Sequence, residues 1–143
     1  MAFRGTFDHS LDAKNRLTVP SKFRAALAEG VVLAKGIEPC VAIWTPEGFE
    51  AFKEAALGGA HRLDRHAQRL RRFFNANAFD TRLDAVYRVM IPPPLIEYAG
   101  LGKQVVVIGN EESLEVWDPG AWAKYETELA PNSDIDSLLG QNA

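Results

Sequence analysis

The chain contains an internal duplication, and this feature constrains its fold more than any other. The run Phe7–Pro20 aligns with Phe79–Pro92 at a constant offset of 72, with Phe, Asp, Leu, Asp, Ala, Arg and Pro all matching. After one inserted residue the offset becomes 73, and Trp44 then aligns with Trp117. Duplication of a unit this small is typical of repeats that cannot bury their apolar faces alone. We therefore expect one compact chain made of two pseudo-symmetric copies.

Each copy shows the same order of predicted elements: a strand, a short helix, a β-hairpin and a second helix. Prolines open the helices at the first turn, where a missing N–H costs nothing, and Thr45 and Asp118 are suitable N-caps. Gly100 is a suitable helix stop. In the first copy these elements fall at 16–19, 20–27, 31–34, 41–44 and 47–57, and in the second at 88–91, 93–99, 105–108, 114–117 and from 119 onward. The fold class expected is mainly β with short helices (α+β).

The two copies are joined by a basic segment and followed by a polar one. Residues 61–74 place apolar side chains at helical spacing among arginines, which predicts an amphipathic basic helix. The resulting organisation is a first repeat at 1–57, a connecting basic helix at 58–74, a second repeat at 75–129 and a flexible polar tail at 130–143. The arginines Arg62, Arg65 and Arg69 suit a solvated face or a subunit contact better than a DNA contact.

Composition and charge narrow the class of protein. With 47% hydrophobic and 24% charged residues the chain is typical of globular proteins, which excludes disorder as its dominant state. It has neither an apolar run long enough for a membrane span nor an apolar leader, so we expect a cytoplasmic protein without membrane contact. The net charge of −3 divides into +4 over residues 1–109 (15 basic, 11 acidic) and −7 over 110–143 (1 basic, 8 acidic).

The sequence offers few groups for catalysis. The histidines His9, His61 and His66 are scattered, and the single cysteine, Cys40, begins an apolar strand where a buried small side chain is expected. No metal-binding or phosphate-binding motif is present. We therefore expect a non-enzymatic protein without cofactor, metal or small-molecule substrate.

The repeated Asp-x-x-x-Arg motif is the strongest functional signal. In the first copy, Asp12 and Asn15 suit a tight turn that presents Lys14 and Arg16 from the start of a strand. A guanidinium held by a neighbouring carboxylate is oriented for bidentate contact with phosphate or with guanine. The alternative, from the motif alone, is a purely structural ion pair.

Several runs together resemble the MraZ family of bacterial transcriptional regulators. They are Arg4–Phe7, Leu11–Arg24, Arg71–Phe74, Val107–Asn110 and Leu114–Asp118. The resemblance implies a duplicated AbrB-like swapped-hairpin β-barrel assembled into a ring-shaped homo-oligomer. It also implies nucleoid-associated, autoregulatory binding of double-stranded DNA at short tandem repeats in the promoter of the division and cell-wall operon, most simply as a repressor.

The resemblance also places the site. The DNA-contacting turn falls on Asp12 to Arg16, and its second copy ends at Arg88. The family usually has Gly before each arginine, where this chain has Asn15 and Tyr87. Because tyrosine tolerates positive φ poorly, we expect the second turn to differ in shape and Arg88 to be the structural copy. The candidate DNA-binding residues are Arg4, Lys14, Asn15, Arg16, Lys22, Arg82 and Arg88, with Asp12 and Asp84 as structural partners.

Two other functions remain open. An antitoxin-like protein could share the fold and bind a protein partner through its acidic tail. A structural ring could bind no nucleic acid, in which case it would lack the salt-dependent DNA affinity that a DNA-binding protein must have.

Overall fold

A computed structural model of the chain describes residues 2–129 and 139–140. The first repeat contains four strands and a helix: β1 (Thr6–Ser10), β2 (Arg16–Thr18), β3 (Val31–Lys35), β4 (Val41–Trp44) and α1 (Pro46–Leu57). Helix α2 (Arg65–Ala76) follows as the connection. The second repeat contains β5 (Phe79–Thr81), β6 (Arg88–Met90), α3 (Pro93–Ala99), β7 (Gln104–Gly109), β8 (Leu114–Trp117) and α4 (Pro119–Glu128). The expected duplicated α+β fold is confirmed.

Strands from the two repeats are interleaved within one antiparallel sheet. Its order is β1-β7-β8-β4-β3-β5, and a separate two-stranded ribbon pairs β2 with β6. The first strand of each repeat therefore pairs with the hairpin of the other repeat, β1 with β7 and β5 with β3. Neither repeat completes its strand pairing alone, which is the physical reason for the duplication.

The central strands are buried on both faces. In β3, Val31 and Leu33 belong to the large inner core, whereas Val32 and Ala34 belong to a second cluster on the opposite face. This explains why β3 and β4 read as continuous apolar runs without alternation. The inner core also receives Leu95 from α3.

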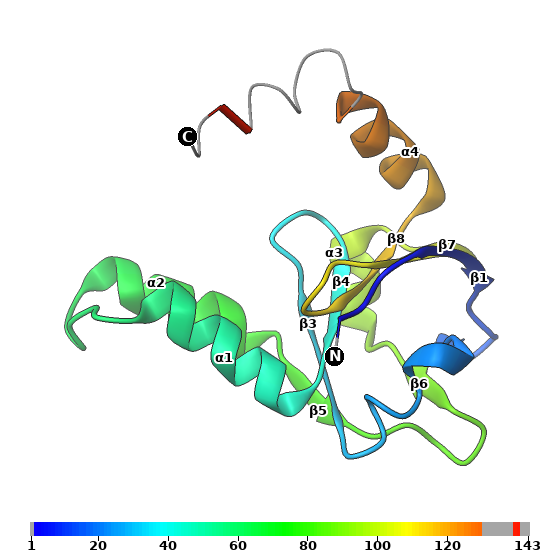
Figure 1. Cartoon of the computed structure of the whole chain (residues 1–143), viewed down its shortest axis with the longest axis horizontal. Coiled ribbons are helices and arrows are strands. Elements are labelled where there is room, and N and C mark those ends of the chain that lie inside the picture. Colours follow the sequence, from blue (N-terminus) through cyan, green and yellow to red (C-terminus); the bar gives the residue numbers. More distant parts are fainter. Residues whose placement is uncertain (1, 130–138, 141–143) are drawn as a thin grey trace.

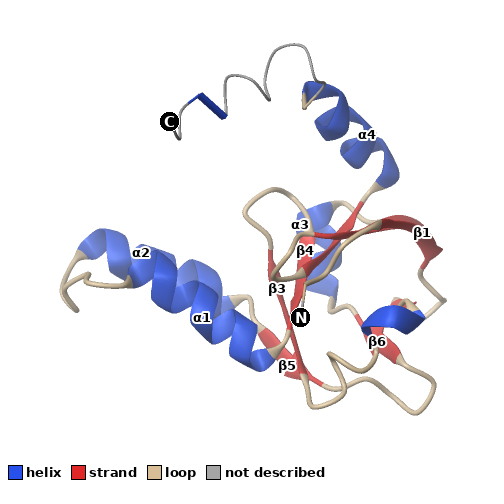
Figure 2. Cartoon of the chain, in the orientation of Figure 1, coloured by secondary structure: helices blue, strands red, loops and turns tan. Residues whose placement is uncertain are grey.

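Two helical layers cover the outer face of the sheet, one from each repeat. Helices α1 and α2 form a hairpin that projects to one side, and α4 lies over the other part of the sheet (Figures 1 and 2). The layers repeat the same aromatic packing: Trp44 of β4 contacts Phe52 of α1 with ring centroids 4.7 Å apart, and Trp117 of β8 contacts Tyr125 of α4 at 5.1 Å. The repeated aromatic positions thus pack the helices onto the sheet.

The helix starts and stops follow the sequence closely. Thr45 Oγ1 accepts a 2.9 Å hydrogen bond from Gly48 N, and Asp118 Oδ2 accepts one of 3.0 Å from Ala121 N. Gly100 ends α3 at φ 62°, in the left-handed region. Helix α2 begins later than expected, at Arg65, because Asp64 serves as its N-cap and accepts from His66 N.

One local prediction was wrong, and two strands were missed. The helix expected at 20–27 is a 3₁₀ turn at Ser21–Phe23, in which backbone bonds run to the third residue back, such as Phe23 N to Pro20 O at 3.0 Å. Strands β1 and β5 were missed because β1 is a mostly exposed edge strand and β5 has only three residues. Neither segment has the apolar periodicity that identifies a strand.

Among the described residues, no helix combines the length and the apolar character needed to cross a membrane. The tail expected at 130–143 lies outside the described residues, apart from 139–140.

Candidate nucleic-acid interface

The first Asp-x-x-x-Arg turn is closed by the Asp12 side chain. Its Oδ1 accepts hydrogen bonds of 2.9 Å from both Lys14 N and Arg16 N, and its Oδ2 accepts one of 2.7 Å from Arg16 Nε. The backbone adds a bond of 2.9 Å from Asn15 N to Asp12 O. Asn15 has φ 57°, a left-handed conformation that asparagine tolerates well. Asp12 thus fixes the turn and the arginine at once.

The second turn has the same shape, so the expected difference was wrong. Asp84 Oδ1 accepts from Val86 N at 3.0 Å and from Arg88 N at 2.9 Å, and its Oδ2 accepts from Arg88 Nε at 2.9 Å. Tyr87 adopts φ 65° in spite of its side chain. The Arg24 guanidinium lies 4.5 Å from the centroid of the Tyr87 ring, a cation–π contact that helps to offset the cost of this backbone conformation.

The ribbon of β2 and β6 brings the two turns together. Leu17 pairs with Val89 at its centre, and both side chains enter the inner core. Successive side chains of a strand point to opposite faces, so the neighbours of Leu17 and Val89 lie on the outer face of the ribbon. This face carries Arg16 and Arg88. Each left-handed residue also bonds to the opposite repeat: Asn15 O accepts from Ile91 N at 2.9 Å, and Tyr87 O accepts from Val19 N at 3.0 Å. The two arginines therefore belong to one surface.

Both carboxylates are held in the charged state. Hydrogen bonding from the Arg16 backbone N–H lowers the pKa of Asp12, with further contributions from the Arg16 side chain and the Lys14 N–H. The Arg88 backbone N–H lowers the pKa of Asp84 in the same way. The arginine side chains remain partly accessible, 29% exposed for Arg16 and 31% for Arg88. Since the carboxylates engage Nε, the terminal guanidinium nitrogens are the groups that can contact a ligand.

Lys14 and Asn15 share this surface, and one residue was missed there. Lys103 lies beside the first turn because its carbonyl accepts a 2.7 Å hydrogen bond from Leu11 N. It lines a shallow hollow together with Asp12 and Asn15. Only the pairing of β1 with β7 brings Lys103 here, and no local motif signals that pairing.

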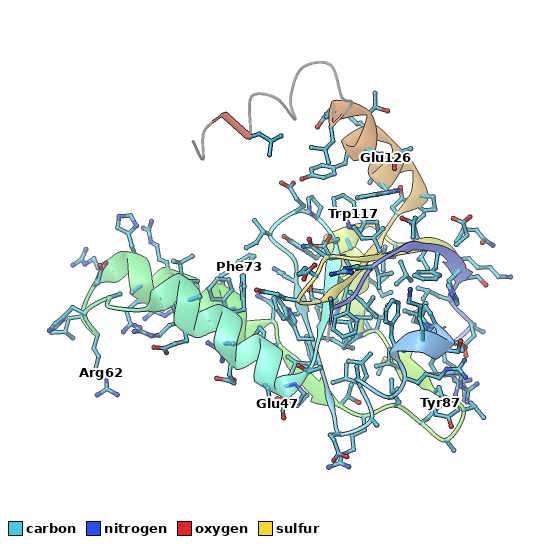
Figure 3. All side chains as sticks on the ribbon, in the orientation of Figure 1. Glu47, Arg62, Phe73, Tyr87, Trp117 and Glu126 are labelled. Atoms are coloured by element: carbon cyan, nitrogen blue, oxygen red, sulfur yellow. The ribbon has the colours of Figure 1, made fainter. Side chains whose placement is uncertain are left out.

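The other candidates lie elsewhere. Arg4 is separated from the first turn by the whole of β1 and faces Glu111, with Nε 3.8 Å from Oε2. Lys22 Nζ lies 5.5 Å from the ring of Phe7 and 5.1 Å from that of Phe23. Arg82 is exposed between β5 and the second turn. The basic helix is remote, since Arg62 and Tyr87 occupy opposite ends of the molecule in Figure 3.

Within residues 2–129 and 139–140, no group of three or more His, Cys, Asp or Glu side chains has the arrangement of a metal site. Cys40 is fully buried, and burial raises the pKa of its thiol. This agrees with the expected inert role of that cysteine.

Comparison with known proteins gives a consistent result. Residues 2–71 and 74–138 match the family model described as "MraZ protein, putative antitoxin-like". A protein of Lactiplantibacillus plantarum is 39% identical over 132 residues, which is 92% of this chain and 93% of that protein. Proteins of Acetivibrio thermocellus (40% identical; 86% of this chain, 85% of that one) and Paenarthrobacter aurescens (40%; 96% and 98%) are similar over most of their length. All three carry the name transcriptional regulator MraZ.

Proposed function

The chain belongs to the MraZ family, and from that premise we propose that it is a transcription regulator that binds double-stranded DNA through its paired Asp-x-x-x-Arg turns. The observation that carries the proposal is the presence of two guanidiniums, each bonded through Nε to an aspartate, on the same outer face of one ribbon. A regulator of this kind needs no catalytic group or cofactor.

The geometry suits direct reading of bases. A guanine presents O6 and N7 in the major groove, and the two terminal nitrogens of an arginine can donate to both. One such pair discriminates against the wrong base by about 1–3 kcal/mol. Arg16 and Arg88 are the base-reading candidates, while Lys14, Asn15 and Lys103 are placed to contact phosphates beside them. Arg4, Lys22 and Arg82 lie outside this group and would contribute mainly through phosphate contacts.

Oligomerisation supplies the remaining affinity. One chain offers few phosphate contacts and carries a net charge of −3, which opposes DNA binding. We propose a ring of copies that presents the paired turns on one face, so that adjacent subunits bind successive short repeats with a high effective concentration. The family resemblance points to the promoter of the division and cell-wall operon, to repression there, and to a cytoplasmic, nucleoid-associated protein.

Substitution of Arg16 tests the proposal directly. Fluorescence anisotropy with DNA from upstream of the chain's own gene, at two salt concentrations, should show that Arg16→Ala weakens binding at least tenfold. Lys124→Ala is the matched control, because it removes one positive charge from an exposed position on α4. Equal affinities for wild type and Arg16→Ala would contradict the proposed role of the turns. If the wild-type protein shows no salt-dependent affinity for this DNA, the alternative of a structural ring that binds no nucleic acid is favoured.

A second candidate function is an antitoxin-like contact with a protein partner. The description of the family model and the net −7 of residues 110–143 favour it. Deletion of residues 131–143 should then remove a co-purifying partner without weakening DNA binding. If no partner is lost, this candidate is rejected.

A further inference from the structure

A cavity lies on the outer face of the sheet, beside helices α1 and α2. Its floor is formed by Ala42 of β4 and Glu115 of β8, which pair directly in the strand register. Phe52 of α1 and Phe74 of α2 line one side, and the turn between β7 and β8 lines the other. The cavity measures about 110 Å³. It lies where β4 of the first repeat meets β8 of the second.

The lining is aromatic and negatively charged. Trp44, Phe52 and Phe74 supply ring surfaces, and Glu112 and Glu115 supply carboxylates. Glu115 accepts hydrogen bonds from neutral donors, Trp117 Nε1 at 3.1 Å and Asn110 Nδ2 at 3.3 Å.

The carboxylates of the cavity are without a paired cation in the described part of the chain. Among the described residues neither Glu112 nor Glu115 forms an ion pair. Lys35 also lines the cavity, but its Nζ lies 4.8 Å from the ring centroid of Tyr98. Aromatic rings beside an unpaired carboxylate are the surroundings that a guanidinium prefers.

Helix α2 carries the complementary group. Arg65, Arg69 and Arg72 follow one another at i, i+4 and i+7, all exposed, and we call them the arginine stripe. Within the described part of the chain none of them forms an ion pair. Helix α2 belongs to a hairpin that projects from the sheet (Figure 1).

The stripe cannot fill the cavity of its own chain. Phe74 is buried and lines the cavity from the inner face of α2, with Ala67 buried on the same face. At about 100° per residue, these two positions lie about half a turn around the helix from the arginine stripe. An arginine of the stripe can therefore enter only the cavity of another copy of the chain.

We propose that the cavity receives an arginine of the arginine stripe from a second copy of the chain. This inference rests on the proposed homo-oligomer and names the surfaces that form it. Charge complementarity supports this occupant, because an acidic aromatic cavity and a basic helix face are both unpaired in the same chain. The contact joins two different surfaces, so each copy uses its cavity for one neighbour and its stripe for the next. Such a head-to-tail contact closes into a ring when its rotation allows.

Charge reversal tests the contact. Sedimentation velocity over a concentration series would compare wild type with Glu112→Lys and Arg69→Glu, both at exposed positions. Each variant alone should weaken self-association at least tenfold, because like charges then face each other. An equimolar mixture should recover assembly, since the wild-type stripe of one variant fits the wild-type cavity of the other and the two reversed surfaces also match. Glu126→Lys and Lys124→Glu, on the exposed side of α4, make the same charge changes away from both surfaces and should assemble like wild type.

The outcomes separate this inference from the proposed function. An oligomer that neither reversal weakens, or a mixture that does not recover, overturns the contact and leaves the ring in place. A wild-type chain that stays single at all concentrations overturns both the contact and the ring. DNA binding through Arg16 is measured independently in either case. A variant that does not assemble because it is misfolded would also not assemble in the mixture. Recovery of assembly in the mixture is therefore the decisive result.

Discussion

Arg88 contacts the aspartate of the opposite repeat: its Nη1 lies 3.8 Å from Asp12 Oδ2, the same oxygen that accepts the 2.7 Å hydrogen bond from Arg16 Nε. One carboxylate oxygen therefore lies against arginines from both copies. Since the two turns also exchange backbone bonds through Asn15 and Tyr87, they form one surface whose two guanidiniums are positioned together.

The left-handed backbone conformation of Tyr87 predicts how substitutions at this position change the free energy of unfolding. Positive φ costs an L-residue about 1–2 kcal/mol, and a β-branched side chain tolerates it least. Tyr87→Val should lower the free energy of unfolding by about 2 kcal/mol, because it also removes the contact with Arg24. Tyr87→Gly should change it by less than about 1 kcal/mol, since glycine accepts the conformation. Urea denaturation would measure both.

Met90→Val is the matched control, because it introduces the same side chain at an exposed strand position three residues away. It should leave stability unchanged. Equal effects of valine at 87 and at 90 would show that the left-handed conformation of the second turn carries no cost.

Local chemistry made the turns and helix ends predictable. Asp12 and Asn15 specify a turn by their own hydrogen bonding and backbone preference, and Thr45 and Asp118 cap helices within three residues of themselves. These features depend on near neighbours in the sequence, so reading the sequence locates them. The shape of the second turn was not predictable, because Arg24, from the other repeat, lies against Tyr87.

Pairing between the repeats was also beyond local analysis. Ser10 lies opposite Gln104, and Leu11 bonds to Lys103, at separations of more than ninety residues. The edge strand that makes these contacts has a mostly polar sequence, and its alternation in burial arises only once it pairs with β7, so its place depends on its partner. Lys103 was missed from the candidate interface for this reason.

The lowered pKa values of Asp12 and Asp84 predict a pH dependence. A carboxyl whose pKa is lower in the folded state stabilises the fold above its unfolded value, about 3.9, and this stabilisation disappears as the pH falls through the folded value. The double variant Asp12→Asn/Asp84→Asn should be less stable than wild type at pH 7, and the difference should shrink below about pH 4. Urea denaturation at pH 7, 4 and 2.5 would test this. A difference that stays constant over that range would contradict it.

Gly109 is required by a close backbone approach. A Cβ there would overlap the backbone of Phe3 and Arg4, whose strand-like segment bonds to Glu111 through Phe3 N at 2.8 Å. Gly109→Ala should displace this segment, expose Phe3 from the core and lower stability by about 3 kcal/mol. Gly102→Ala, where the Cβ meets open space, should have no effect. Thermal unfolding of the two variants would compare them, and equal melting temperatures would refute the steric argument.

The variant Asp12→Asn distinguishes two contributions of Asp12 to DNA binding: the orientation of the Arg16 side chain and the negative charge of the carboxylate. The asparagine Oδ1 can still accept from Lys14 N and Arg16 N, so the turn persists, but its Nδ2 replaces the oxygen that holds Arg16 Nε. The variant loses one negative charge, which strengthens non-specific binding to phosphates. It loses the fixed guanidinium, which weakens base reading. We expect the ratio of specific to non-specific affinity to fall about tenfold, consistent with loss of one well-oriented bidentate contact. Anisotropy titrations with operator and scrambled DNA at two salt concentrations would measure it.

Asp8→Asn, an exposed position on β1 with the same charge change, should raise both affinities equally. If Asp12→Asn behaves like Asp8→Asn, then Asp12 contributes only its charge and the orientation of Arg16 has no part in recognition.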